Sequence, residues 1–377
     1  MDNITINIAG DFYLPKIDNW TFESSLKEII DKGDINVINL EAPLRANGCI
    51  PEKKSGPSLY QDEKVPKWLE GIGFNVVNCA NNHINDFGEE SILYTTKAFS
   101  SNATILGVGS FNEAYTIKII KCKDKRIGFL SITQYEFGVH DDIAYSINKI
   151  AAAWMCHPSV TERIKDSHKI CDVLIVLPHA GLENFTLPLP ELRTLYRHFI
   201  NMGADAVVAS HPHVVQPWEE YNGKYIYYSL GNFCFDFNNK NVNSDKGIIV
   251  QLQISNDNSF KVKTIPTIYN RKSKIVGIYD EDEYNNFLKN INFIFKNEKE
   301  YINQVNSHCL QLKPMYDMLL SMGGYHKINT IRKAAGFLKQ QIKAILKRKP
   351  ITYNNAHFIN SIRCETHRWV LSRIYEV

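Results

Sequence analysis

The chain has 377 residues, 22% of them charged, and a net charge of +3. Apolar residues make up 44% of it, which suffices for one large or two smaller buried cores and excludes an intrinsically disordered chain. Its longest apolar runs, such as Val173–Leu177, are far shorter than the roughly 18 apolar residues of a membrane helix.

The N-terminal residues carry neither a basic cluster nor a long apolar segment, so we expect no signal peptide and a cytoplasmic location. The eight cysteines form no CxxC pair, which argues against a zinc ribbon and favours free thiols in a reducing compartment.

Charge is unevenly distributed. Residues 281–377 carry a net +7, whereas residues 1–280 carry a net −4. This asymmetry predicts two units: a catalytic domain over residues 1–275 and a basic helical region over residues 280–377.

Strand-like apolar runs alternate with helical periodicity along the first two thirds of the chain. The predicted strands are 4–9, 35–40, 74–79, 104–106, 116–120, 126–132, 172–177, 206–209, 225–229, 247–254 and 261–268. The predicted helices are 22–30, 64–70, 89–99, one within 144–164, and 189–202. The alternation is typical of an α/β fold, and the later strands without intervening helices indicate a mixed or two-sheet arrangement.

The C-terminal third is predicted to be helical over 283–295, 302–322 and 327–347. The last of these has an apolar stripe, and its opposite face carries basic residues, among them Lys339 and Lys343. Such a helix either packs on the catalytic body or contacts an anionic membrane surface or partner, and the pattern leaves both open.

Polar residues of the kinds that bind metals follow the predicted strands. They are Asp11, Glu41, Asn82, His83, His179, His211 and His213. Ligands of α/β proteins gather beyond the carboxyl ends of strands, so we expect these side chains to meet. A mixed set of imidazole, carboxylate and amide groups suits Mn, Fe or Zn. A carboxylate shared between two ions about 3.5–4 Å apart is typical of two-metal hydrolases.

Six motifs occur in order and carry a family resemblance. They are Gly10-Asp11, Asn39-Leu40-Glu41, Ala80-Asn81-Asn82-His83, His179-Ala180-Gly181-Leu182-Glu183, Ser210-His211-Pro212-His213-Val214-Val215-Gln216 and Tyr228-Ser229-Leu230-Gly231-Asn232-Phe233. From about Ile4 to Ile268 the chain resembles the CapA family of poly-γ-glutamate capsule-synthesis type proteins, within the calcineurin-like metallophosphoesterase superfamily. The resemblance implies a four-layer α-β-β-α sandwich, here with a C-terminal helical extension.

The resemblance also implies roles for these residues. Asp11 and His213 would bind one divalent metal ion, Asn82, His179 and His211 a second, and Glu41 would bridge both. His83 would be the catalytic acid or transition-state stabiliser.

Further residues are assigned around this core. Glu183, Gln216 and Asn232 are the candidate substrate-binding residues, and Asp86 is expected to cap a helix or hold His83. Tyr13 stands where the wider superfamily has a histidine ligand, so we expect the first metal site to be the weaker of the two.

We therefore expect a metal-dependent hydrolase, most simply a phosphoesterase, acting on a phosphorylated or acidic polymer or sugar in bacterial capsule or polysaccharide metabolism. Two alternatives remain open: an accessory protein for an acidic polymer such as polyglutamate, and a metal-dependent hydrolase or ligase of amide bonds. The basic C-terminal helices could add a peripheral membrane or partner contact. No groove of interleaved basic and aromatic residues indicates nucleic-acid binding.

Overall fold

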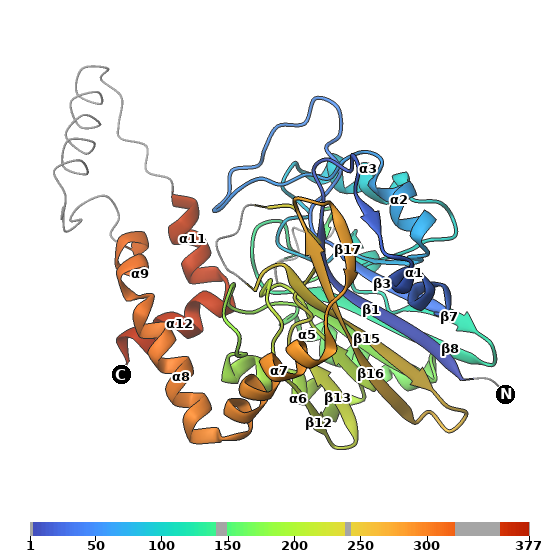
Figure 1. Ribbon diagram of the computed structural model, residues 1–377. Coiled ribbons are helices and arrows are strands. Elements are labelled where there is room, and N and C mark those ends of the chain that lie inside the picture. Colours follow the sequence, from blue (N-terminus) through green and yellow to red (C-terminus); the bar gives the residue numbers. More distant parts are fainter. Residues whose placement is uncertain (1–2, 141–148, 238–242, 321–354, 377) are drawn as a thin grey trace. The chain divides into compact units, whose positions relative to one another are not determined.

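The computed structural model describes residues 3–140, 149–237, 243–320 and 355–376 (Figure 1). They form two compact units, of which the first comprises residues 1–52 and 57–305 and the second residues 53–56 and 306–377. This division lies later in the chain than the boundary at 275–280 that the charge distribution predicts.

A nine-stranded sheet forms one half of the first unit. Its order is β2-β17-β16-β15-β1-β3-β4-β5, and β14 also pairs with β1. The strands are β1 (Ile4–Tyr13), β2 (Thr21–Phe22), β3 (Ile35–Leu40), β4 (Val76–Asn78), β5 (Thr104–Leu106), β14 (Asn232–Phe235), β15 (Lys246–Ile254), β16 (Phe260–Asn270) and β17 (Ile275–Ile278). The strands β1, β3, β4 and β5 run parallel, so their carboxyl ends meet at one rim.

A six-stranded sheet of order β12-β13-β11-β10-β8-β7 forms the other half. Its strands are β7 (Lys118–Cys122), β8 (Lys125–Thr133), β10 (Val173–His179), β11 (Ala206–Val208), β12 (Trp218–Tyr221) and β13 (Lys224–Tyr227). A small additional pair joins β6 (Val108–Gly109) to β9 (Ala151–Ala152).

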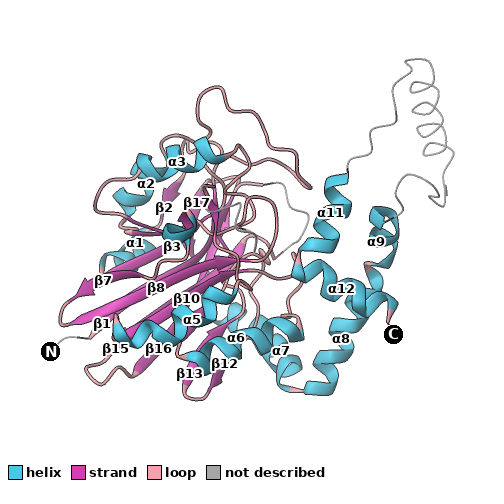
Figure 2. Ribbon diagram, turned by 180° about the vertical axis from the view of Figure 1, so that it is seen from behind, coloured by secondary structure: helices cyan, strands magenta, loops and turns pink. Residues whose placement is uncertain are grey.

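Helices cover both outer faces. The helices of the first half are α1 (Ser24–Asp31), α2 (Val65–Ile72) and α3 (Glu89–Ala98), and those of the second are α4 (Phe111–Ala114), α5 (Pro158–Asp166), a 3-10 turn (Ser167–Lys169) and α6 (Pro190–Met202). One apolar core lies between the sheets, with Ile6 of β1 and Ile175 of β10 among its members. Another lies between the first sheet and its helices, with Leu26 and Leu69. The predicted α-β-β-α sandwich is confirmed (Figure 2).

Helices dominate after β17. They are α7 (Glu281–Lys296), α8 (Glu298–Gln311), α9 (Lys313–Leu320), α11 (Asn355–Arg363) and α12 (Glu365–Tyr375). In the second unit, the Tyr316 hydroxyl lies 2.6 Å from His367 Nδ1. The predicted basic helix over 327–347 lies outside the described residues. Within the ranges described, no helix is both long and apolar enough to cross a membrane.

Candidate metal centre

Neighbouring strands of the nine-stranded sheet bring Asp11 and Asn39 together. β1 pairs in parallel with β3 and β14, and the register places Asp11 opposite Asn39 on one side and Asn232 on the other. Both pairings are irregular at Asp11, so the strand bulges where the site begins. Asn39 Nδ2 donates to Asp11 Oδ1 at 2.7 Å, which fixes the carboxylate.

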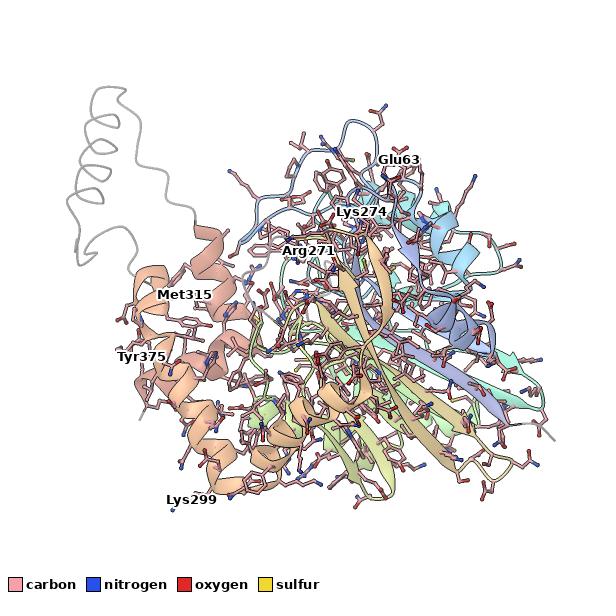
Figure 3. All side chains as sticks on the ribbon, viewed as in Figure 1. Glu63, Arg271, Lys274, Lys299, Met315 and Tyr375 are labelled. Carbon is pink, nitrogen blue, oxygen red and sulfur yellow. The ribbon has the colours of Figure 1, made fainter. Side chains whose placement is uncertain are left out.

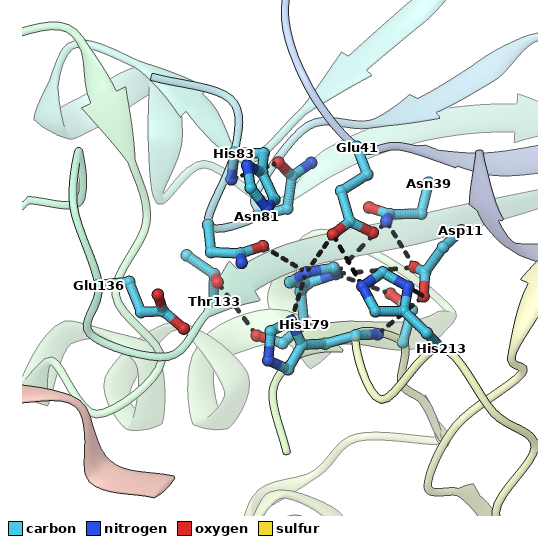
Figure 4. A network of polar contacts seen from close by, with 12 residues as sticks. Asp11, Asn39, Glu41, Asn81, His83, Thr133, Glu136, His179 and His213 are labelled. Atoms are coloured by element: carbon cyan, nitrogen blue, oxygen red, sulfur yellow. Dashed lines mark hydrogen bonds and ion pairs between the residues drawn. The ribbon is translucent and has the colours of Figure 1, made fainter. Parts of the chain in front are cut away.

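The six-stranded sheet supplies the histidines. His179 is the last residue of β10, and it forms an isolated bridge with Ser210, just beyond β11. His211 and His213 follow, and both have positive φ angles, +105° and +58°. Such conformations cost about 1–3 kcal/mol each in non-glycine residues and persist where the surroundings enforce them, typically at functional sites. The imidazole of His213 lies beside the Asp11 carboxylate (Figure 4), and that of His211 lies beside His179.

Two groups of buried side chains could each hold a metal ion, and they share Glu41. One consists of Asp11, Glu41 and His213, and the other of Glu41, His179 and His211. In the first, His213 Nε2 lies 3.4 Å from Glu41 Oε1. In the second, His179 Nε2 lies 3.9 Å from the same oxygen and 3.0 Å from His211 Nδ1.

Asn82 extends the second group. Its Oδ1 lies 3.0 Å from His179 Nε2. His179 Nδ1 lies 3.1 Å from the Ser210 hydroxyl, which can accept its hydrogen and leave a lone pair on Nε2. The lone pairs of Asn82 Oδ1 and His179 Nε2 would then face one another, and a cation between these two atoms would stabilise them.

Glu41 shows that these residues fit a cation. Its side chain is fully buried, and neither carboxylate oxygen accepts a hydrogen bond from the described parts of the chain. Burial raises the pKa of Glu41 well above its ordinary value, and Asp11 adds to this effect while His213 opposes it. A buried carboxylate without hydrogen bonds is costly, and bound cations at its two oxygens would remove that cost.

The pKa values of the histidines are consistent with a cation-binding site. Burial lowers the pKa of His179 and of His211, so both are neutral imidazoles, the form that binds metals. Burial also opposes protonation of His213, but Glu41 and Asp11 outweigh it and raise the pKa of His213 to about 10.

His83 lies beside this cluster rather than within either group. Burial lowers the pKa of His179 most, and His83 is among the neighbouring histidines that lower it further, which places the two imidazoles near one another. His83 Nδ1 lies 2.7 Å from Asp86 Oδ2, which also accepts from the backbone N–H of Leu59. Since an ionised carboxylate only accepts, Nδ1 carries the hydrogen, and Asp86 orients the ring.

Tyr13 packs behind the first group. Its ring lies 5.2 Å from that of Phe235, whose ring in turn lies 4.5 Å from His213. Burial raises the pKa of Tyr13 to about 12, so its phenol stays neutral and is a poor ligand. Within the described residues, the first group thus has three candidate ligands against four in the second.

The three expected substrate-binding residues are placed differently from one another. Glu183 is exposed, and its charge is among the influences on the pKa values of Glu41 and His211, which places it near the centre. Gln216 is buried, and its Nε2 donates to the carbonyl oxygens of Phe185 and Leu187. These contacts favour a structural role for Gln216, holding the loop after β10. Asn232 is also buried, and its amide contacts His213 instead of solvent.

Other residues of the site were not predicted as functional. Asn39 was visible in the motif Asn39-Leu40-Glu41, because strand alternation puts residues 39 and 41 on one face. Gln134 follows β8, and its Nε2 lies 3.0 Å from His211 Nε2. The rule that polar residues after strands form sites would have found Gln134. Asn81 shapes the loop after β4 by donating to the carbonyl oxygen of Leu40 at 2.8 Å.

Comparisons with known proteins bear on the same region. The family described as "Bacterial capsule synthesis protein PGA_cap" matches residues 7–237, a span that includes all six motifs. The PGA biosynthesis protein CapA of Bacillus subtilis is 28% identical over 247 residues, covering 62% of this chain and 64% of that protein. The capsule biosynthesis protein CapA of Bacillus anthracis is 31% identical over 186 residues, covering 47% of this chain and 44% of that protein. The matches thus span less than two thirds of either relative.

Among solved structures, the NAD nucleotidase of Haemophilus influenzae is similar with a TM-score of 0.41 and 10% identity. The match covers 81% of this chain and 62% of that one.

Proposed function

Since the chain belongs to the bacterial capsule synthesis protein family PGA_cap, we propose that it is a metal-dependent hydrolase of phosphoesters in capsule or surface-polymer metabolism. The observation that carries this proposal is the pair of buried ligand groups that share Glu41. Two divalent ions, Mn, Fe or Zn, would polarise a phosphoryl group there and activate a water molecule.

Six residues of the chain would serve as metal ligands. Asp11 and His213 would hold one ion, His179, His211 and Asn82 the other, and Glu41 both. Their burial keeps water away from the ligand atoms and holds the imidazoles in fixed orientations.

His83 would deliver a proton to the leaving oxygen. Asp86 holds its Nδ1–H at 2.7 Å, so Nε2 is the nitrogen that can exchange a proton with substrate. Glu183, exposed beside the centre, would contact the substrate rather than an ion.

The family and the chemistry of the ligand groups together support a substrate class. We propose a phosphorylated or acidic polymer or sugar. A second candidate, a non-hydrolytic accessory protein for an acidic polymer, is favoured by Tyr13, which leaves the first ligand group one residue short. A third, an amide hydrolase or ligase, would use the same ions to polarise a carbonyl group.

The test is a comparison of products. Full-length protein loaded with Mn²⁺ or Zn²⁺ is assayed with p-nitrophenyl phosphate, bis(p-nitrophenyl) phosphate and γ-glutamyl-p-nitroanilide. We expect p-nitrophenol from a phosphoester. Release of p-nitroaniline alone would favour amide chemistry, and no release from metal-loaded protein would favour the accessory role.

The variant His83→Gln refines this test. We expect kcat for the phosphoester to fall about 10²- to 10⁴-fold, the usual contribution of general acid–base catalysis, with bound metal unchanged. Lys165→Gln, on the exposed part of α5, is the control and should behave as wild type. Unchanged turnover by His83→Gln would contradict the role of His83.

A further inference from the structure

Asn232 makes three contacts that together determine how its amide is oriented. It lies at the start of β14 and is only 1% exposed. Its Nδ2 lies 2.7 Å from the carbonyl oxygen of Ser244 and 3.3 Å from that of His213. Its Oδ1 lies 3.0 Å from His213 Nδ1. Carbonyl oxygens only accept, so the NH₂ group must face them and the amide oxygen must face the imidazole.

This orientation assigns the hydrogen on His213. Because the amide oxygen of Asn232 can only accept, His213 Nδ1 must carry a hydrogen and donate it. The lone pair for a metal is then on Nε2, the nitrogen 3.4 Å from Glu41 Oε1. The ring nitrogen that binds a metal is set by the hydrogen bond of the other nitrogen.

Asn232 also restrains the backbone that carries the ring. Its contact with the His213 carbonyl supports a residue held at φ +58°, a left-handed conformation that histidine adopts at a cost. The ring of Phe235, 4.5 Å away, limits the rotation of the imidazole.

The support continues outwards from Asn232. The Ser244 carbonyl oxygen that accepts from Asn232 also accepts from the Tyr269 hydroxyl at 2.8 Å. Arg271 lies in the turn after β16 (Figure 3). Its Nη2 donates to the Tyr269 hydroxyl and to the Phe235 carbonyl oxygen, each at 3.3 Å. His213 is thus tied through Asn232 to a network anchored on β14 and β16.

We propose that Asn232 is a positioning residue that fixes His213 with Nε2 directed at the first metal ion and thereby sets the affinity of that site. The inference rests on the proposed function, since it assumes a metal between Asp11, Glu41 and His213. This positioning role takes the place of the substrate contact that the sequence predicts for Asn232. With Tyr13 in place of a further ligand, this site depends on His213 more than the second site depends on any one of its ligands.

The experiment is calorimetric titration of chelator-treated, full-length protein with Mn²⁺. We expect two binding events in the wild type. Asn232→Leu keeps the side-chain volume but removes the acceptor for His213 Nδ1–H. It should weaken one Mn²⁺-binding event about 10- to 100-fold, the usual effect of losing a hydrogen-bond partner of a metal ligand. The affinity of the other event should stay within about threefold of the wild type. Asn232→Asp keeps an acceptor for Nδ1–H but loses the donor to the His213 and Ser244 carbonyl oxygens, so it should recover only part of the affinity.

A matched control distinguishes positioning from general damage. Asn36 is also buried and accepts from Asn7 Nδ2 at 2.8 Å, at the opposite end of β3. Asn36→Leu should lower the melting temperature without changing either Mn²⁺ affinity. If Asn232→Leu leaves both affinities unchanged, or weakens both equally, the proposal is wrong. If the wild type binds no Mn²⁺, Zn²⁺ or Fe²⁺, the proposed function fails as well.

A second measurement needs no variant. In zinc-loaded protein with ¹⁵N-labelled histidine, NMR should show His213 with a protonated Nδ1 and a zinc-bound Nε2. The reverse assignment, with zinc on Nδ1, would overturn the inference even if Asn232→Leu failed to fold.

Discussion

Glu41 carries an electrostatic cost that the fold alone does not relieve. Its carboxylate is fully buried near Asp11, and burial raises its pKa well above the ordinary value. Residues with strongly perturbed pKa values concentrate at functional sites. Because Glu41 belongs to both ligand groups whereas Asp11 belongs to one, the two residues should differ in a measurable way.

We expect Glu41→Gln to weaken both metal-binding events and Asp11→Asn to weaken one. Each change keeps the side-chain volume but removes the charge that attracts a cation. Calorimetric titration with Mn²⁺ measures both affinities separately. Loss of a single event in Glu41→Gln would show that Glu41 does not bridge.

At the residue scale, the sequence predicts which side chains meet but not how each is used. Asp11, Glu41, His179, His211 and His213 all follow apolar runs that are predicted as strands, and that pattern is visible in the sequence alone. The contacts of Gln216 with the loop after β10 and of Asn232 with His213 depend on which loops approach one another. The order of the motifs along the chain carries no information on which loops approach one another.

At the element scale, the junction of β1 and β14 sets the geometry of the centre. We predict β1 to end at Ala9, before Gly10-Asp11, yet the strand continues to Tyr13. It does so because β14, more than 200 residues later, pairs with its end, and Asp11 N donates to the Gly231 carbonyl oxygen at 3.0 Å. A strand pairing this distant leaves no local signal in the sequence.

Gly10→Ala should therefore destabilise the protein by about 3 kcal/mol or more, since the new Cβ would lie 2.0 Å from a backbone oxygen that cannot move freely. Gly71→Ala, in α2 with open space around its Cβ position, is the control. It should stabilise by about 0.5–1 kcal/mol through helix propensity. Urea unfolding measures both, and equal stabilities of the two variants would refute this packing argument.

Glu219 in β12 links this strand to α6. It accepts hydrogen bonds from Arg197 Nε at 2.8 Å and from the Tyr228 hydroxyl at 2.6 Å. Burial opposes ionisation, but these bonds outweigh it and lower the pKa of Glu219 below 4.5. A carboxyl group with a lowered pKa stabilises the fold above its unfolded-state pKa, and this contribution is lost as the pH falls through the folded-state value.

We expect Glu219→Gln to cost about 2 kcal/mol at pH 7, the usual worth of hydrogen bonds to a charged group. The difference from wild type should shrink as the pH falls below the ordinary glutamate range towards the lowered pKa of Glu219, where Glu219 itself becomes protonated. Urea unfolding at pH 7 and pH 3.5 tests this, and a difference independent of pH would count against the charged network.

At the scale of the whole molecule, the α-β-β-α sandwich was predictable because strands and helices alternate with clear periodicity. The helical region was predicted less well. One helix was expected over 302–322, but α8 ends at Gln311 and α9 begins at Lys313, next to Pro314, which lacks a backbone donor. The helices α11 and α12, of nine and eleven residues, were not expected.

The central claim is that this sandwich holds two divalent ions at the carboxyl ends of its strands, bridged by Glu41. The most direct test is the metal content of the full-length protein purified without a chelating tag, measured by plasma mass spectrometry. We predict two Mn, Fe or Zn ions per chain after reconstitution, and loss of metal from both sites in Glu41→Gln. A wild-type protein that holds none of these metals, even after reconstitution, would contradict the account.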